Sequence, residues 1–236
     1  MPDRSPRPEG AALPVQALIF DMDGTMIDSM PWHAKSWVTF AQRHGITMPA
    51  DEILRRTTGR TGTECMREVF ERELPADECL ALVNEKEAIY RELFDAPFAE
   101  VAGFTAFARQ AAARGLKVAV GTAGDRHNVA FALDRLKMDP PPLTVVGGDE
   151  GLRGKPEPDI FLEAARRIDA DPARCIVFED APFGIEAARR AGMRAVAVCS
   201  THGADELAGP HVVATVRDYH SLLRSNFLET LDVALS

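Results

Sequence analysis

The amino-acid sequence predicts an α/β protein with a parallel sheet, covered by helices on both faces, and an inserted helical segment. Short, continuously apolar segments alternate with helical ones along most of the chain, which is typical of strands buried on both faces. Residues 31–96 break this alternation, because they show helical apolar spacing and no convincing strand. Polar side chains follow the apolar segments directly, at the sheet edge where such folds bind ligands.

The first strand is predicted over residues 15–20 and ends at two aspartates, Asp21 and Asp23. One residue separates them, so both side chains can leave the strand end on the same side, and Gly24 permits a sharp turn. Two such carboxylates repel each other unless a cation such as Mg²⁺ lies between them. A solvated turn is the alternative for this stretch alone. A calcium loop is excluded, since the positions that need Gly and Glu hold other residues.

The helical insert begins at Pro31, and its first helix is predicted to stop at Gly45. Thr61 and Glu64 match a capping box, which predicts the start of a second helix. A third helix is expected over residues 77–94. Beyond the insert we predict, in order, helix 104–114, strand 116–120, helix 128–137, strand 143–146, a helix from 158, strand 175–178, helix 184–191, strand 195–199, an edge strand 212–216 and a closing helix from 219.

Chemically capable residues follow four of these strands. Beside the two aspartates, Thr122 follows the second strand, Lys155 lies in the loop after the third, and Glu179 and Asp180 follow the fourth. Each one alone is more typical of a surface ion pair or a helix cap. Together, at one edge of a parallel sheet, they predict a site.

This set of residues suits phosphoryl transfer. A carboxylate at Asp21 can attack phosphorus, and Asp23 can serve as the general acid–base. Mg²⁺ held by Asp21, the backbone carbonyl of Asp23 and Asp180, with Glu179 binding directly or through water, would reduce the repulsion between anions. Lys155 and Thr122 complete the predicted catalytic set by offsetting charge and donating hydrogen bonds.

The residues 21–25, Thr122, the run 154–156 and the run 178–180 resemble the four motifs of the haloacid dehalogenase superfamily. Within it the chain is most similar to β-phosphoglucomutase-like phosphatases and mutases. The resemblance implies a Rossmann-like core domain over residues 15–30 and 97–236, a small helical cap domain over 31–96, and dependence on Mg²⁺. It speaks against a dehalogenase, since those enzymes lack the second aspartate that Asp23 supplies.

The cap and the segment after Thr122 supply the predicted substrate-binding residues. His33 and Lys86 match β-phosphoglucomutase residues, and the others in the set are Arg60, Ala123 and Arg126. The mutase pattern places an arginine about three residues after Gly59, where this chain has Gly62. We therefore predict a Mg²⁺-dependent phosphatase for a small phosphorylated metabolite, a sugar phosphate. A hexose phosphomutase and a non-catalytic sugar-phosphate sensor are the alternatives.

Composition and net charge limit the classes of partner that the protein can bind. The chain of 236 residues has a formal net charge of −9 and no basic run, which disfavours nucleic acid and membrane surfaces as partners. Its four cysteines form no metal motif, and no apolar stretch has the length of a membrane span. We expect a disordered leader at residues 1–14 and a cytoplasmic protein that is a monomer or a weak dimer.

Overall fold

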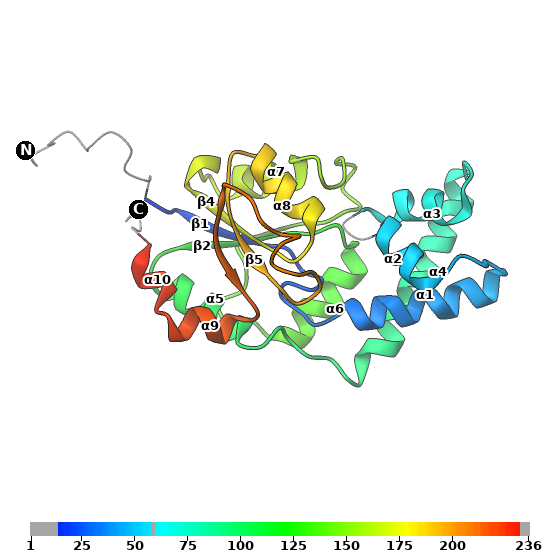
Figure 1. Ribbon diagram of the computed structural model, residues 1–236, viewed down its shortest axis with the longest axis horizontal. Helices are drawn as coiled ribbons and strands as arrows, with labels where there is room; N and C mark the ends of the chain where they lie inside the picture. The colour runs from blue at the N-terminus through cyan, green and yellow to red at the C-terminus, as the bar shows by residue number, and fades with distance from the viewer. Residues whose placement is uncertain (1–13, 58–59, 232–236) are drawn as a thin grey trace, which may run out of the picture.

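A six-stranded, fully parallel sheet forms the centre of the computed structural model (Figure 1). The structure describes residues 14–57 and 60–231, so the predicted leader lies outside the described residues except for Pro14. The strand order is β3-β2-β1-β4-β5-β6, which is the doubly wound order of Rossmann-like folds. The strands are β1 (Ala17–Phe20), β2 (Lys117–Gly121), β3 (Thr144–Val146), β4 (Cys175–Glu179), β5 (Arg194–Val198) and β6 (Val212–Val216). The predicted fold class is confirmed.

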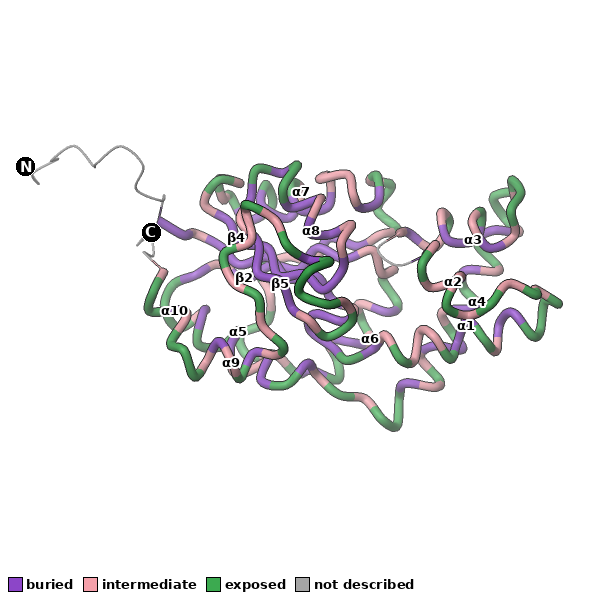
Figure 2. The backbone as a smooth tube through the Cα atoms, viewed as in Figure 1, coloured by how far each residue is buried: buried purple, intermediate pink, exposed green. Residues whose placement is uncertain are grey.

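Helices cover both faces of the sheet because successive strand residues point to opposite sides. Leu18 and Phe20 of β1 belong to one apolar cluster, whereas Ala17 and Ile19 belong to another. The first cluster includes residues of α5 (Phe104–Ala113), α6 (Arg126–Leu136), α9 (Tyr219–Arg224) and α10 (Phe227–Thr230). The second includes residues of α7 (Asp159–Arg167) and α8 (Pro182–Arg190). The central strands are accordingly the most continuously buried part of the described chain (Figure 2).

Four helices lie between β1 and α5 and extend beyond one end of the sheet (Figure 1). They are α1 (Met30–His44), α2 (Ala50–Thr57), α3 (Gly62–Phe70) and α4 (Ala76–Asp95), and we call them the cap helices. Their inward faces form a third apolar cluster that includes Phe40, Ile53 and Met66. The described part of the insert contains no strand, as predicted. The exact division of the chain into a core and a cap stays a prediction.

The structure corrects several element boundaries. Helix α2 was not predicted, because only Ile53 and Thr57 of its eight residues are buried and charged side chains dominate it. The predicted closing helix is two helices, α9 and α10, separated at Asn226, where the backbone is left-handed with φ 52°. Strand β4 continues through Glu179, so this residue ends the strand rather than following it. The edge strand β6 has the predicted bounds, and α1 stops at Gly45 as expected.

Candidate active site

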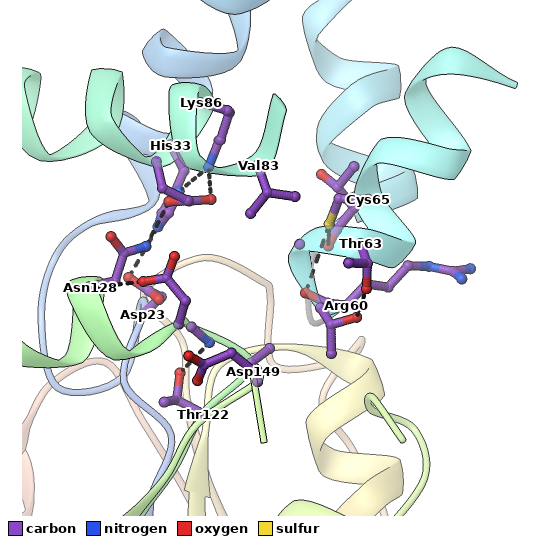
Figure 3. A pocket seen from close by; sticks show the side chains of 18 of the residues that line it. Asp23, His33, Arg60, Thr63, Cys65, Val83, Lys86, Thr122, Asn128 and Asp149 are labelled. Atoms are coloured by element: carbon purple, nitrogen blue, oxygen red, sulfur yellow. Dashed lines mark hydrogen bonds and ion pairs between the residues drawn. The ribbon is translucent and has the colours of Figure 1, made fainter. Parts of the chain in front are cut away.

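A cavity of about 250 Å³ lies between the carboxyl ends of the strands and the cap helices. Strands β1 and β4 are neighbours at the point where the strand order reverses, which is where doubly wound sheets bind ligands. The lining contains every side chain that the sequence placed in the site: Asp21, Asp23, His33, Arg60, Lys86, Thr122, Ala123, Arg126, Lys155, Glu179 and Asp180. Figure 3 labels five of them, namely Asp23, His33, Arg60, Lys86 and Thr122. Their functional roles stay predictions, but their convergence is a property of the fold.

Asp21 lines the cavity, is buried and is paired with Lys155. The Lys155 Nζ is 2.5 Å from Asp21 Oδ1 and 2.8 Å from Glu179 Oε1, and all three residues are buried. Burial raises the pKa of Asp21 to about 7; Lys155 opposes this rise and Glu179 adds to it. Burial alone would lower the pKa of Lys155, but its two carboxylate partners, Asp21 and Glu179, raise it instead. Lys155 therefore carries a positive charge at neutral pH.

Asp21, Glu179 and Asp180 form an acidic cluster whose carboxylate oxygens lie within 4.8 Å of one another. Burial, Glu179 and Asp21 raise the pKa of Asp180 well above its ordinary value. The Asp180 Oδ2 is buried, and none of the residues that the structure describes donates a hydrogen bond to it. An unpartnered buried carboxylate oxygen within an oxygen-rich cluster fits a hard cation such as Mg²⁺. The Asp23 carboxylate is not in this cluster, so its predicted ligand atom remains the backbone carbonyl.

Two glycines allow this close arrangement of acids. A Cβ at Gly24, where φ is 76°, would lie 2.1 Å from Asp180 Oδ2. A Cβ at Gly184 on α8 would lie 1.7 Å from Glu179 Oε1. Any larger residue would displace the carboxylates, so both positions require glycine for space, and Gly24 also for its positive φ.

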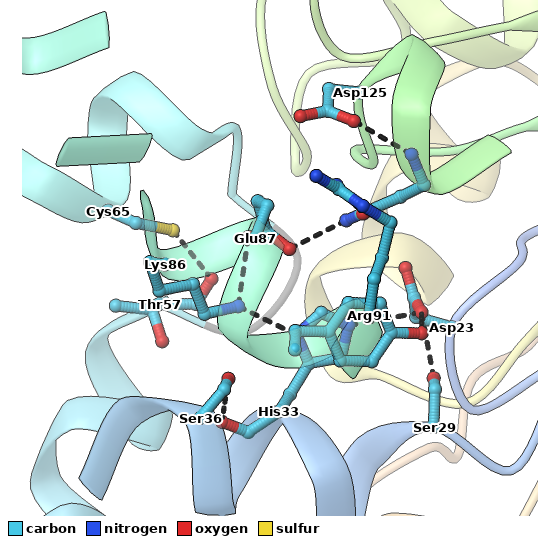
Figure 4. A network of polar contacts seen from close by, with 12 residues as sticks. Asp23, Ser29, His33, Ser36, Thr57, Cys65, Lys86, Glu87, Arg91 and Asp125 are labelled. Carbon is cyan, nitrogen blue, oxygen red and sulfur yellow. Dashed lines mark hydrogen bonds and ion pairs between the residues drawn. The ribbon is translucent and has the colours of Figure 1, made fainter. Parts of the chain in front are cut away.

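Asp23 has a different environment, on the cap side of the cavity. Its Oδ1 accepts hydrogen bonds from the Ser29 hydroxyl at 2.7 Å and the Tyr90 hydroxyl at 3.3 Å, and lies 3.1 Å from His33 Nε2 (Figure 4). Burial opposes ionisation, but His33, Ser29 and Lys86 outweigh it and lower the pKa of Asp23. Asp23 is therefore held as a carboxylate in the ligand-free protein.

The partner on the far side of His33 defines its tautomer. Lys86 Nζ lies 2.7 Å from His33 Nδ1, and an ammonium group can only donate. Nδ1 must therefore accept, which places the imidazole proton on Nε2, facing Asp23. The ring of His33 also stacks on Tyr90 with centroids 3.8 Å apart. Tyr90 and Ser29 were not predicted as site residues, although Tyr90 follows Lys86 by four residues and so shares its helix face.

The remaining predicted residues line the cavity and have partners outside the acidic cluster. Thr122 is buried at the end of β2, and its Oγ1 accepts the Gly124 N–H at 3.0 Å. Arg60 Nη1 is 3.3 Å from Glu68 Oε1, and the Arg60 guanidinium carbon lies 5.7 Å from the centre of the Phe183 ring. Arg126 is exposed at the rim, 4.0 Å from Asp149. Gly59 lies outside the described residues, so the position of Arg60 relative to this glycine stays a prediction.

Beside the ionisable side chains of His33, Arg60, Lys86 and Glu87, apolar and neutral polar side chains line the cap side of the cavity. They include Trp37, Leu54, Thr57, Thr61, Thr63, Cys65, Leu80, Val83 and Asn84. Cys65 is no candidate nucleophile, because burial raises the pKa of its thiol to about 12. This wall can contact a leaving group, whereas the acidic cluster and Lys155 lie at the opposite, sheet side.

Comparison with known proteins identifies the family. The model of the haloacid dehalogenase-like hydrolases matches residues 15–192, and the chain belongs to this family. The predicted enzyme class, a hydrolase of this superfamily, is thereby confirmed. A solved hydrolase from Pseudomonas syringae superposes with a TM-score of 0.80 at 26% identity, over 92% of this chain and 100% of that one.

Three characterised relatives are similar in sequence. The validoxylamine A 7'-phosphate phosphatase of Streptomyces hygroscopicus subsp. limoneus is 34% identical, over 83% of this chain and 91% of its own. The fructose-1-phosphate phosphatase of Escherichia coli is also 34% identical, over 77% and 95%. The β-phosphoglucomutase of Bacillus subtilis is 31% identical, over 78% and 83%. In the described part of the chain, no helix combines the length and apolar character needed to cross a membrane.

Proposed function

We propose that the protein is a Mg²⁺-dependent phosphatase that hydrolyses a small phosphorylated metabolite, a sugar phosphate, through an aspartyl-phosphate intermediate. The observation that carries the proposal is the pair of aspartates in contrasting environments: Asp21 in a buried acidic cluster beside Lys155, and Asp23 ionised and hydrogen-bonded on the cap side. One carboxylate is placed to meet the phosphoryl group, and the other to manage a proton.

The proposed reaction has two steps. An Asp21 carboxylate oxygen attacks phosphorus, the bond from phosphorus to the ester oxygen breaks, and Asp23, which takes up a proton from solvent as the substrate binds, protonates the departing oxygen. Water then attacks phosphorus while Asp23 accepts its proton, and the bond from phosphorus to the Asp21 oxygen breaks. This step releases phosphate and restores Asp21, and Asp23 returns its proton to solvent. Lys155 and Thr122 stabilise the charge on the transferring oxygens. Asp21, Glu179, Asp180 and the Asp23 carbonyl would hold Mg²⁺, which supplies positive charge for the approach of two anions.

The relatives and the cavity support the substrate class. Two of the relatives are named as phosphatases, one of them for fructose 1-phosphate. The cap wall offers hydroxyl and amide groups at Thr61, Thr63 and Asn84, which suit the hydroxyls of a sugar. We infer the predicted domain division from the same arrangement, with the core of residues 15–30 and 97–236 supplying the chemistry and the cap of residues 31–96 contacting the leaving group.

A hexose phosphomutase is the second candidate. The contacts of Asp23 with His33 and of His33 with Lys86, two residues that resemble β-phosphoglucomutase residues, favour it. Two observations on the loop before α3 argue against a mutase. Gly62 stands where the mutase pattern has its arginine, and the nearby Arg60 forms an ion pair with Glu68, with Nη1 3.3 Å from Oε1. A mutase must bind a second phosphate and exclude water, whereas a phosphatase must only admit water. A phosphatase therefore needs fewer substrate-binding side chains than a mutase does.

The experiment is a panel of phosphorylated metabolites incubated with the protein and Mg²⁺, with Asp21→Asn as the control. We expect inorganic phosphate to be released from at least one sugar monophosphate by the wild type and not by the variant. With β-glucose 1-phosphate and a trace of the 1,6-bisphosphate, accumulation of glucose 6-phosphate without phosphate release would establish the mutase instead. Binding of sugar phosphates without turnover would establish the sensor.

A further inference from the structure

Helix α4 of the cap contacts helix α6 of the core along one continuous stripe. At one end, the rings of Tyr90 and Phe94 on α4 lie 6.4 and 6.0 Å from the ring of Phe131 on α6. At the other end, next to the cavity, the contact is polar and involves Glu87, Arg91 and Asn128. Burying polar groups costs free energy unless their hydrogen bonds are satisfied, so the polar end needs an explanation of its own.

Asn128 is held in one orientation between a pure donor and a pure acceptor. Its Oδ1 accepts from Arg91 Nη1 at 2.7 Å, and its Nδ2 donates to Glu87 Oε2 at 2.6 Å. A guanidinium cannot accept and a carboxylate cannot donate, so the amide cannot flip without losing both bonds. Asn128 is 2% exposed, and its own backbone N–H is capped by Asp125 at 2.9 Å.

From Asn128 the contacts continue without a gap to Asp23. The second oxygen of Glu87, Oε1, accepts from Lys86 Nζ at 2.9 Å, and this ammonium also donates to His33 Nδ1, whose ring in turn reaches Asp23 (Figure 4). Lys86 is 2% exposed, and Glu87 Oε1 is an acceptor that orients its ammonium group toward His33, a role that a glutamine oxygen can also fill. Helix α6 of the core is thereby connected to Asp23 through α4 and α1.

We propose that Glu87 and Asn128 form a positioning pair, which aligns the cap with α6 and so fixes Lys86, His33 and finally the Asp23 carboxylate for proton transfer. The inference rests on the proposed function, because it assigns the pair to the proton-transfer step of that reaction. Neither residue touches the reacting atoms, so both are positioning residues. Their loss should lower kcat, which depends on the placement of Asp23, more than it changes KM.

The chain offers a charge-conserving exchange that tests the pair. In Asn128→Asp two carboxylates face each other, and in Glu87→Gln one amide oxygen must serve both Lys86 and Asn128. The double variant Glu87→Gln/Asn128→Asp restores complementary partners: the new amide donates to the new carboxylate, which still accepts from Arg91. Glu85→Gln is the matched control, since Glu85 lies on the same helix but pairs with Arg43 and His44 of α1.

Steady-state phosphate release from the best substrate of the panel is measured for all variants, with thermal melting as the check of folding. We expect each single variant to lower kcat at least about tenfold with KM within about threefold, the double variant to recover to within about threefold of wild type, and Glu85→Gln to match wild type. Because Asn128 is buried, the milder Asn128→Ser is included, with the same expected loss of kcat.

Four results would overturn the positioning pair. The single variants could keep the wild-type kcat, or they could raise KM while kcat stays unchanged. Glu85→Gln could lose as much kcat as they do, or the double variant could be no more active than the single variants. If a single variant does not fold, Asn128→Ser and the double variant decide by the same criteria. Wild-type protein that releases no phosphate would overturn the proposed function itself, which separates the two failures.

Discussion

Asp21 and Asp23 are two residues apart, yet the protein gives their carboxyl groups opposite properties. Asp21 lies among the acids of the sheet edge, where burial raises its pKa to about 7. Asp23 lies against the cap, where donors from Ser29, His33 and Tyr90 converge on one oxygen and its pKa is lowered. The acids of the sheet edge thus surround Asp21, whereas His33 and Tyr90 of the cap helices contact Asp23, so the environment of each carboxyl group can be altered separately. We call these two environments the core half and the cap half.

The largest expected effect comes from the core half. Asp21→Asn removes the proposed nucleophile and should lower kcat by at least about 10³-fold, as loss of a group in covalent catalysis does. The fold should survive, because the amide keeps the shape of the side chain and one repelling carboxylate is lost from the acidic cluster. Phosphate release and thermal melting measure the two effects, and release at more than a tenth of the wild-type rate would contradict the assignment.

The cap half should respond differently. Asp23→Asn removes the proposed acid–base and should lower kcat by about 10² to 10⁴-fold. The loss in kcat/KM, which reports the phosphorylation step, should be smaller for p-nitrophenyl phosphate than for a sugar phosphate, since the nitrophenolate leaves without a proton. Phosphorylated protein should also accumulate, because no base remains to activate water, and intact-mass measurement after acid quench detects it. Equal losses in kcat/KM with both substrates would reject the role of Asp23 as an acid.

The dependence of the melting temperature on pH and on Mg²⁺ tests the environment of Asp21. With its pKa raised from 3.8 to about 7, Asp21 binds a proton more tightly in the folded than in the unfolded protein. The stability that this tighter proton binding contributes is therefore complete below pH 3.8, falls as the pH rises, and is fully lost above about pH 7. In chelator, the melting temperature of Asp21→Asn minus that of wild type should grow from pH 5.5 to pH 8.

Mg²⁺ provides the control for this pH dependence. A cation held by the acidic cluster would offset the repulsion among Asp21, Glu179 and Asp180, so Mg²⁺ at pH 8 should raise the melting temperature of wild type by several degrees. Asp21→Asn should gain less. A difference between the two proteins that is unaffected by pH and by Mg²⁺ would argue against a cation site in the cluster.

The core half was predictable from sequence and the cap half only partly. Parallel strands bring their carboxyl ends together, so Asp21, Lys155 and Glu179 could be placed in one site from their positions after apolar segments. Positions on cap helices carry no such rule, because the contact of α4 with α6 depends on tertiary packing. His33 and Lys86 were reached through a family resemblance, whereas Glu87 and Asn128 gave no signal in the sequence.

Local signals explain the remaining successes and errors of the fold prediction. The Thr61–Glu64 capping pattern is short-range, and the structure shows Glu64 Oε2 accepting the Thr61 N–H at 2.8 Å. Helix α2 was missed because its stability comes from burying Ile53 and from pairs such as Glu52 with Arg56, rather than from an apolar stripe of normal width. A periodicity argument has too few apolar positions to detect such a helix.

The smallest effect is expected from the weakest donor to Asp23. Tyr90→Phe removes a hydroxyl that lies 3.3 Å from Asp23 Oδ1 and keeps the ring that stacks on His33. Since Ser29 and His33 still donate to the same oxygen, kcat should fall only about threefold, within the range for one net hydrogen bond. Ser29→Ala, which removes the shorter contact at 2.7 Å, should cost more. If Tyr90→Phe costs as much as Asp23→Asn, Tyr90 itself would have to be the proton donor, and the division of labour between the two aspartates would fail.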